Sequence, residues 1–247
     1  MTKYIFIFFI VIFFGCSSDE IIVEKSADYY FKFGMSEFQD ENYFEAIENF
    51  KTVTLQFSVS KYGDSAQYYL GECYFARKEF LLAAYEYEML KKTMSLSELL
   101  PLAQFKLAMC YYQLSPKHII EQKYTYKAID EFQIFLEYYP SHDSSKIATE
   151  KIRELILKLA KKELETGNTY LQLENYKSAI HYFKNVIEKF HDTPYVEDAQ
   201  LGIVEAMINR KKFKEAKEEL EFFFTKYPKS EKKERAESLE KSIDEKF

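Results

Sequence analysis

An internal repeat constrains the fold of this chain more than any other feature of its sequence. Three segments, which begin at Phe31, Tyr68 and Leu164, share a glycine, an alanine twelve residues after it and an aromatic residue four further on. Two more copies fit when the first position is another apolar residue. The five first positions are Gly34, Gly71, Ala108, Gly167 and Val204, and the alanines are Ala46, Ala83, Ala128, Ala179 and Ala216. Such periodicity is typical of arrays in which each unit packs on its neighbours.

Composition indicates that each unit is helical. The chain of 247 residues has only six glycines and five prolines, which argues against a turn-rich β protein and for long helices. Two of the segments close on "LEYYP" and "FTKYP", where Pro140 and Pro228 end a helix. The pattern resembles the tetratricopeptide repeat, a pair of antiparallel helices of about 34 residues. We therefore expect an all-α solenoid of five helix pairs.

Spacing shows where this array is irregular. The distance from small residue to alanine is twelve in four repeats but twenty in the third, so eight residues are inserted around "LSPKHIIE". The step from Ala108 to Gly167 is 59 instead of 37, which leaves another fourteen residues before the fourth repeat. A helical stripe of apolar residues crosses that stretch at Ile147, Ile152, Leu155, Ile156 and Leu159. We expect one long helix between an N-terminal lobe (27–143, repeats one to three) and a C-terminal lobe (144–247, the linking helix and repeats four and five).

The N-terminus reads as a targeting segment. An apolar run from Tyr4 to Phe14 follows Lys3, and as a helix it would be about 17 Å long against about 30 Å of bilayer hydrocarbon. It is too short to span a membrane and has the layout of a secretory signal, 1–15. Gly15 and Cys16 resemble the lipobox of bacterial lipoproteins, although Phe13 stands where that box usually has leucine. The resemblance implies acylation at Cys16 and a lipid-anchored linker, 16–26; a plain signal peptide with an incidental cysteine is the alternative.

Catalysis and several binding functions are not indicated. The net charge is -6 and no segment is strongly basic, which disfavours nucleic-acid binding. No nucleotide-binding, hydrolase or zinc motif is present, so we expect no enzyme activity, no cofactor and no metal site. Cys73 and Cys110 each follow the small residue of a repeat by two places. They could fill space between helices or form one disulfide.

The combination of lipobox, five repeats, an extended third-to-fourth junction and the segment "LAKKELETGNTY" (Leu159–Tyr170) resembles the BamD family of outer-membrane assembly lipoproteins. The resemblance implies a lipid-anchored scaffold, on the periplasmic face of the outer membrane, that binds unfolded outer-membrane proteins and a BamA-type barrel protein. A periplasmic scaffold for cell-wall or envelope machinery stays open as an alternative. A sugar-binding surface lipoprotein is disfavoured, because such chains are about twice as long and rely on tryptophan, which this chain lacks.

Resemblance to the repeat family also implies which residues line the binding groove. In the first lobe they form a largely aromatic set: Phe31, Met35, Phe38, Tyr68, Glu72, Phe75, Phe105, Met109, Tyr112 and Gln113. In the second lobe they are polar: Lys161, Asn168, Gln172, Asp198, Glu205 and Asn209. We predict that the aromatic set binds the terminal strand of an unfolded barrel protein, unless neighbouring elements cover it. Arg210, Lys211 and Lys212 are the predicted docking group for the barrel partner, with a solvated turn as the alternative.

Overall fold

The computed structural model describes residues 26–246, so the predicted signal segment and Cys16 lie outside the described residues. Eleven helices make up this part of the chain, and it contains no strand. In chain order they are α1 (Ala27–Gln39), α2 (Tyr43–Gln56), α3 (Gly63–Ala76), α4 (Phe80–Thr93), α5 (Leu100–Leu114), α6 (Lys123–Tyr138), α7 (Ser145–Gln172), α8 (Tyr176–Lys189), α9 (Val196–Asn209), α10 (Phe213–Lys226) and α11 (Lys233–Asp244).

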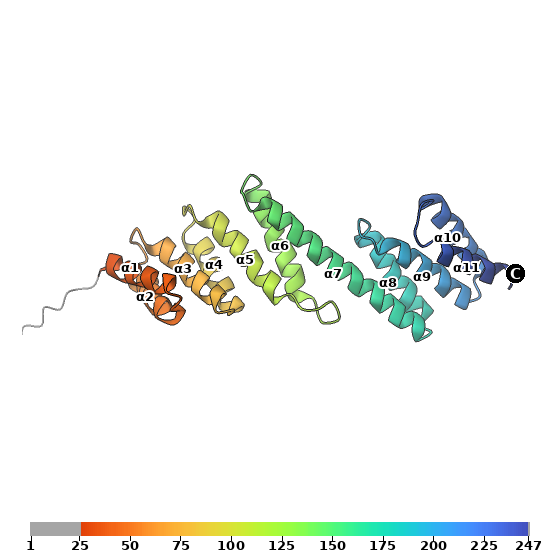
Figure 1. Ribbon diagram of the computed structural model, residues 1–247, viewed down its shortest axis with the longest axis horizontal. Coiled ribbons are helices and arrows are strands. Elements are labelled where there is room, and N and C mark those ends of the chain that lie inside the picture. The colour runs from red at the N-terminus through yellow and green to blue at the C-terminus, as the bar shows by residue number, and fades with distance from the viewer. Residues whose placement is uncertain (1–25, 247) are drawn as a thin grey trace, which may run out of the picture.

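Consecutive helices pack against each other along one elongated row, with α1 and α11 at opposite ends (Figure 1). The first ten helices form the five predicted pairs, which confirms the repeat solenoid. The eleventh helix was not predicted. It buries Ala236 and Ile243 against the apolar side chains of α9 and α10, and so covers the face that a sixth repeat would otherwise cover.

The repeated glycines let helices within a pair approach closely. A Cβ atom added to Gly71 would lie 2.6 Å from the Tyr87 ring, and one added to Gly167 would lie 2.6 Å from the Phe183 ring. Gly34 meets Phe50 in the same way at 2.9 Å. Each of these aromatics stands sixteen residues after its glycine, on the second helix of the pair. The spacing of sixteen residues in the sequence therefore corresponds to a contact between a glycine and a buried aromatic ring.

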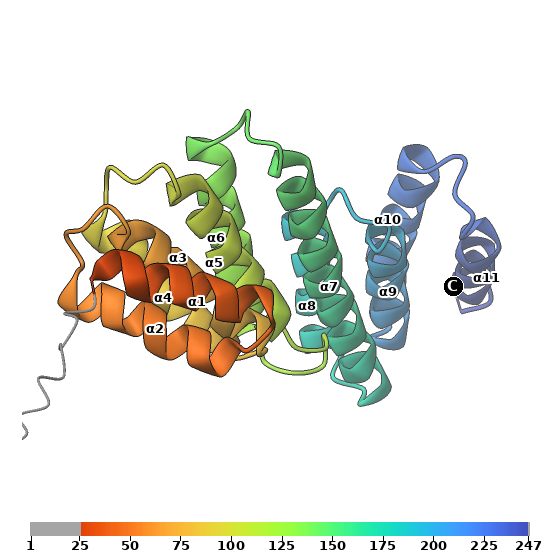
Figure 2. The same ribbon diagram turned by 60° about the vertical axis from the view of Figure 1, so that its left-hand side comes forward.

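The extended junction is the single helix α7, which has 28 residues and serves two repeats. Its first half packs on the third repeat through Ala148 and Leu155, and its second half packs on the fourth through Leu164 and Gly167. Figure 2 shows α7 in front of α8, with α5 and α6 on one side and α9 on the other. The fourteen extra residues thus lengthen a repeat helix instead of adding a separate one.

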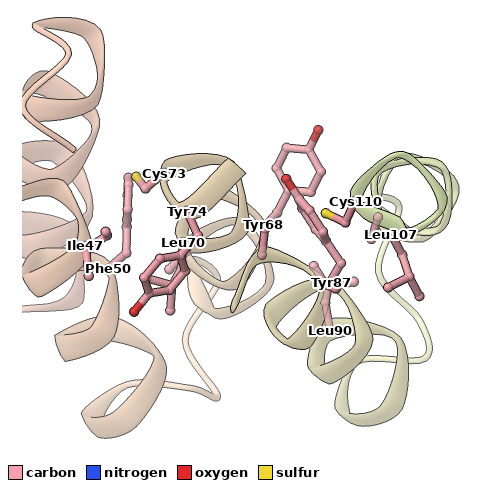
Figure 3. Packing of buried hydrophobic residues seen from close by; sticks show 14 of the residues in the cluster. Ile47, Phe50, Tyr68, Leu70, Cys73, Tyr74, Tyr87, Leu90, Leu107 and Cys110 are labelled. Atoms are coloured by element: carbon pink, nitrogen blue, oxygen red, sulfur yellow. The ribbon is translucent and has the colours of Figure 1, made fainter. Parts of the chain in front are cut away.

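The two cysteines outside the N-terminal segment are free and buried. Figure 3 shows Cys73 beside Phe50 and Cys110 beside Tyr87, in successive layers of the array. Burial raises the pKa of Cys73 to about 12, and it raises the pKa of Cys110 as well. Both side chains act as small apolar fillers, and the disulfide that the sequence left open is absent from the structure.

No helix of the described residues has the length and apolar character needed to cross a membrane.

Candidate binding surfaces

The predicted aromatic set of the first lobe lies on α1, α3 and α5, where its rings pack helix against helix. Phe31 stacks on Tyr62 with ring centroids 4.8 Å apart, and Phe75 meets Phe80 at 5.2 Å. Phe105 contacts the buried ring of Phe135 at 5.4 Å.

Other members of the set are also partly covered. Phe38 lies edge-on to Tyr69 with ring centroids 5.4 Å apart, and Tyr68 is only 9% exposed. Met35 and Met109 pack on the core clusters, whereas Gln113 is exposed. The surface therefore offers the edges of these rings and not whole aromatic pockets.

Polar groups of the set are engaged across neighbouring helices. Glu72 of α3 accepts a hydrogen bond from the buried Tyr87 hydroxyl, and Lys106 of α5 lies 2.7 Å from its second oxygen. Lys106 also lies 4.9 Å from the centre of the Phe75 ring. Burial, together with the Glu72 charge, raises the pKa of Tyr87, so its hydroxyl stays a proton donor. This network links repeats two and three through the face on which the set lies.

A second polar link joins α5 to α7. The Tyr112 hydroxyl donates a hydrogen bond to Glu154, and Lys151 Nζ lies 4.5 Å from the centre of the Tyr112 ring. Its hydrogen bond with Tyr112 and its pairing with Lys151 lower the pKa of Glu154. Glu154 and Lys151 are both on the first half of α7. Tyr112 therefore stands at the boundary between the two lobes.

The predicted polar groove of the second lobe is brought together by the fold. Asn168 and Gln172 of α7 and Glu205 and Asn209 of α9 line one pocket of about 330 Å³. Leu171 of α7 and Arg235 of α11 complete the lining, and Arg235 pairs with Glu205 at 3.0 Å.

The other two predicted residues of this groove do not line that pocket. Asp198 pairs with Arg235 at 3.4 Å and with Lys232 at 3.0 Å, and Lys161 lies along α7 at 3.7 Å from Glu165. Sequence reasoning missed Arg235, because the eleventh helix was not predicted.

The eight-residue insertion of the third repeat rests on α7. Lys158 Nζ donates to Ser115 Oγ at 2.8 Å, and Lys162 Nζ donates to the Ile120 carbonyl at 2.6 Å. His118 Nε2 lies 2.6 Å from a Glu165 oxygen. Three polar contacts therefore hold the insertion on the helix that the two lobes share.

The predicted docking group forms the turn between α9 and α10. Lys211 has a φ of 61°, and its amide bonds to the Ile208 carbonyl while that of Lys212 bonds to the Met207 carbonyl. This hydrogen-bond pattern ends a helix at a left-handed residue. Glu41, Lys78 and Glu174 occupy the same left-handed position in three other repeats. The turn is therefore a repeated structural element to which this repeat adds positive charge.

The three cations of that turn differ in their availability. Lys212 lies 2.6 Å from Glu215 and lowers the pKa of that carboxyl. Arg210 and Lys211 make no ion pair or side-chain hydrogen bond within residues 26–246. Two positive side chains without an ion pair in this part of the chain thus lie beside the C-terminal end of α9, Lys211 exposed and Arg210 half-buried.

Metal ligands are not clustered in the described part of the chain, where no group of three or more His, Cys, Asp or Glu side chains could hold an ion.

The chain is similar to known outer membrane proteins. A model of the family YfiO, outer membrane lipoprotein, matches residues 23–199 and 171–240. The outer membrane protein assembly factor BamD of Caulobacter vibrioides is 25% identical over 188 residues, which are 75% of this chain and 61% of that protein. This chain thus matches less than two thirds of the length of that curated relative.

Solved structures of repeat proteins are also similar. A TPR repeats protein from Bacteroides fragilis has a TM-score of 0.45 at 14% identity, with 90% of this chain and 100% of that chain covered. The TPR domain of P58(IPK) has a TM-score of 0.46 at 15% identity, with 89% and 60% covered.

Proposed function

Because the chain belongs to the YfiO family of outer membrane lipoproteins, we propose that it is a lipid-anchored scaffold of the machinery that folds and inserts β-barrel proteins in the outer membrane. The family match across residues 23–240 carries this proposal. The name of the matched relative, an outer membrane protein assembly factor, gives the process. A helix-pair solenoid suits such a role, since it presents extended surfaces to several partners at once.

Anchoring is assigned to Cys16, with the folded repeats on the periplasmic face. Acyl chains at this residue provide the two or more hydrophobic signals that stable membrane attachment requires. The Cys16→Ala variant is expected to leave the outer-membrane fraction and to appear as a soluble or unprocessed chain. Membrane fractionation and intact-mass measurement test this, and a variant that is still processed and still fractionates with outer membrane would contradict it.

Docking to a BamA-type barrel protein is assigned to Arg210 and Lys211. Neither side chain forms an ion pair with another residue of the described part of the chain, whereas Lys212 is held by Glu215. The double variant Arg210→Asp with Lys211→Glu should abolish co-purification of the barrel protein. It should still fold, because Asp40 and Glu41 occupy the same two positions in the first repeat.

The matched control for this experiment is Lys177→Glu with Lys184→Glu, which makes the same change of charge on exposed positions of α8. Recovery of the barrel protein should be unchanged with the control. Equal recovery with both double variants would reject the turn as the contact. Co-purification of cell-wall proteins in place of a barrel protein would favour the alternative scaffold role.

Unfolded barrel proteins are assigned to the face of the first lobe that carries Tyr68, Glu72, Met109, Tyr112 and Gln113. An extended chain there would meet ring edges and the Glu72–Lys106 and Tyr112–Glu154 links, which supply apolar and polar contacts at fixed spacing. Truncation of Phe105 would open a cavity beside Phe135, so Tyr112 is the better target.

The substrate assignment is tested with Tyr112→Ala. Binding of a labelled C-terminal barrel peptide should weaken by about 1–3 kcal/mol, the usual range for an interface anchor. Tyr126→Ala removes an exposed tyrosine from α6 and is the matched control. If the two variants bind the peptide equally, the peptide does not use this face.

A further inference from the structure

A pocket of about 510 Å³ lies where the first half of α7 faces the loop between α8 and α9. It is separate from the surfaces assigned above. The residues that line it are Thr149, Ile152, Arg153, Ile156, Leu157, Lys189, Phe190, His191, Asp192 and Thr193. Its volume lies within the range of about 300–1,000 Å³ found for ligand-binding clefts.

The pocket results from the fourteen extra residues of α7. Without them, α7 would begin close to the point where it packs on α8, and its Thr149–Leu157 stretch would not stand opposite the α8–α9 loop. Phe190, which follows α8, reaches the apolar cluster that α7 forms with the third repeat. One wall of the pocket therefore comes from α7, and the other comes from the end of α8 and the loop that follows it.

Its floor is apolar and incompletely covered. Ile152, Ile156 and Phe190 pack on the core cluster and yet keep part of their surface exposed. Leu157 is also half-buried. Filling such a surface with an apolar group removes it from water, which favours binding. The floor thus suits a large apolar side chain.

Unpaired positive charge stands on two walls. Arg153 belongs to α7 and Lys189 ends α8, and neither forms an ion pair with any other residue between 26 and 246. The remaining charged residues are His191 and Asp192, which lie 3.3 Å apart and are largely exposed. In a chain with a net charge of -6, this rim is locally basic. A ligand that complements this pocket would have an apolar group with an anionic group on each side of it.

We infer that the pocket binds an extended segment of a partner protein in which one large apolar side chain is flanked by acidic residues. The apolar side chain lies on Ile152, Ile156 and Phe190, and the two carboxylates pair with Arg153 and Lys189. Arginine and lysine on separate helices favour two separate carboxylates over the single charged head of a lipid. The site is independent of the basic turn that follows α9 and of the face of the first lobe.

The probe is a peptide with capped ends and the sequence Gly-Glu-Phe-Glu-Gly, in which benzoylphenylalanine replaces phenylalanine for photo-crosslinking. It is titrated against the full chain in mild detergent, and the cross-linked residues are located by mass spectrometry. Saturable labelling is expected within Thr149–Leu157 and 189–193. The peptide with glutamine in place of both glutamates should label at least tenfold less.

The decisive variant is Arg153→Glu with Lys189→Glu, which should also reduce labelling at least tenfold. The matched control, Lys177→Glu with Lys184→Glu, makes the same change of charge away from the pocket and should label like the natural chain. Circular dichroism confirms that each variant keeps its helical content. Labelling that is not saturable, that spreads over other helices or that survives reversal of Arg153 and Lys189 would overturn the inference. So would binding of anionic lipid vesicles, sensitive to the same reversal, without binding of the peptide.

Discussion

Phe183 offers a quantitative test of how the repeats pack, because its ring lies between two glycines. A Cβ atom added to Gly167 of α7 would lie 2.6 Å from one edge of the ring, and one added to Gly202 of α9 would lie 2.6 Å from the other. Phe183 itself is fully buried on α8. The perturbation is Gly202→Ala, which forces a methyl group into that contact.

Two effects of opposite sign set the magnitude. Alanine is favoured over glycine inside a helix by about 1 kcal/mol. Overpacking of a filled core costs about 1–3 kcal/mol. Gly202→Ala should therefore destabilise the protein by up to about 2 kcal/mol. In a Phe183→Leu background the ring edge is gone, so the same substitution should instead stabilise by about 1 kcal/mol.

The assay is urea unfolding of the four chains of this double-mutant cycle, followed by circular dichroism. The expected coupling between the two positions is about 1–3 kcal/mol, the range found for residues in direct contact. If Gly202→Ala changes the free energy of unfolding by the same amount in both backgrounds, the added methyl group makes no unfavourable contact with the Phe183 ring. The packing explanation of these glycines would then be refuted.

Three further predictions concern other buried or strained groups. Glu174→Gly should raise the free energy of unfolding by about 0.5–1 kcal/mol, because a left-handed φ of 58° is strained for glutamate; no gain in urea unfolding would contradict this. Alkylation of Cys73 and Cys110 by iodoacetamide at pH 8 should be slow in the folded chain and fast in urea, since burial raises both pKa values. Tyr87→Phe should lower the free energy of unfolding by about 1–3 kcal/mol, because the partly buried Glu72 loses a donor; an unchanged urea midpoint would show that the network adds no stability.

Periodicity in the sequence predicted most of the fold. Spacing between Gly71 and Tyr87, and between Gly167 and Phe183, reflects direct contacts, so the helix pairs could be placed correctly. The single long helix followed from an apolar stripe, and the resemblance to the BamD family is confirmed by the family match. In the fifth repeat the prediction chose Val204 as the small position. The glycine that meets a neighbouring ring there is Gly202, which packs on the preceding repeat and not within its own.

The surfaces were harder to predict, for a physical reason. A position in a repeat defines the direction of a side chain, but not whether a larger neighbour covers it. Phe31 and Phe105, for example, pack on Tyr62 and Phe135. The polar positions of the second lobe are smaller and less apolar, so they stay at the surface and line a pocket. The basic turn, the anchor and the substrate face remain predictions.

Both irregularities of the repeat array, the eight-residue insertion and the fourteen extra residues, involve α7. The insertion of the third repeat is held on the middle of this helix by Lys158, Lys162 and Glu165, while the fourteen extra residues extend its first half. A helix of 28 residues is about 42 Å long and stiff. One continuous helix therefore packs on both the third and the fourth repeat and joins the two lobes. Under the proposed function, a client held on one lobe would lie at a fixed distance from a barrel protein docked on the other, and assembly would depend on that distance as much as on either contact.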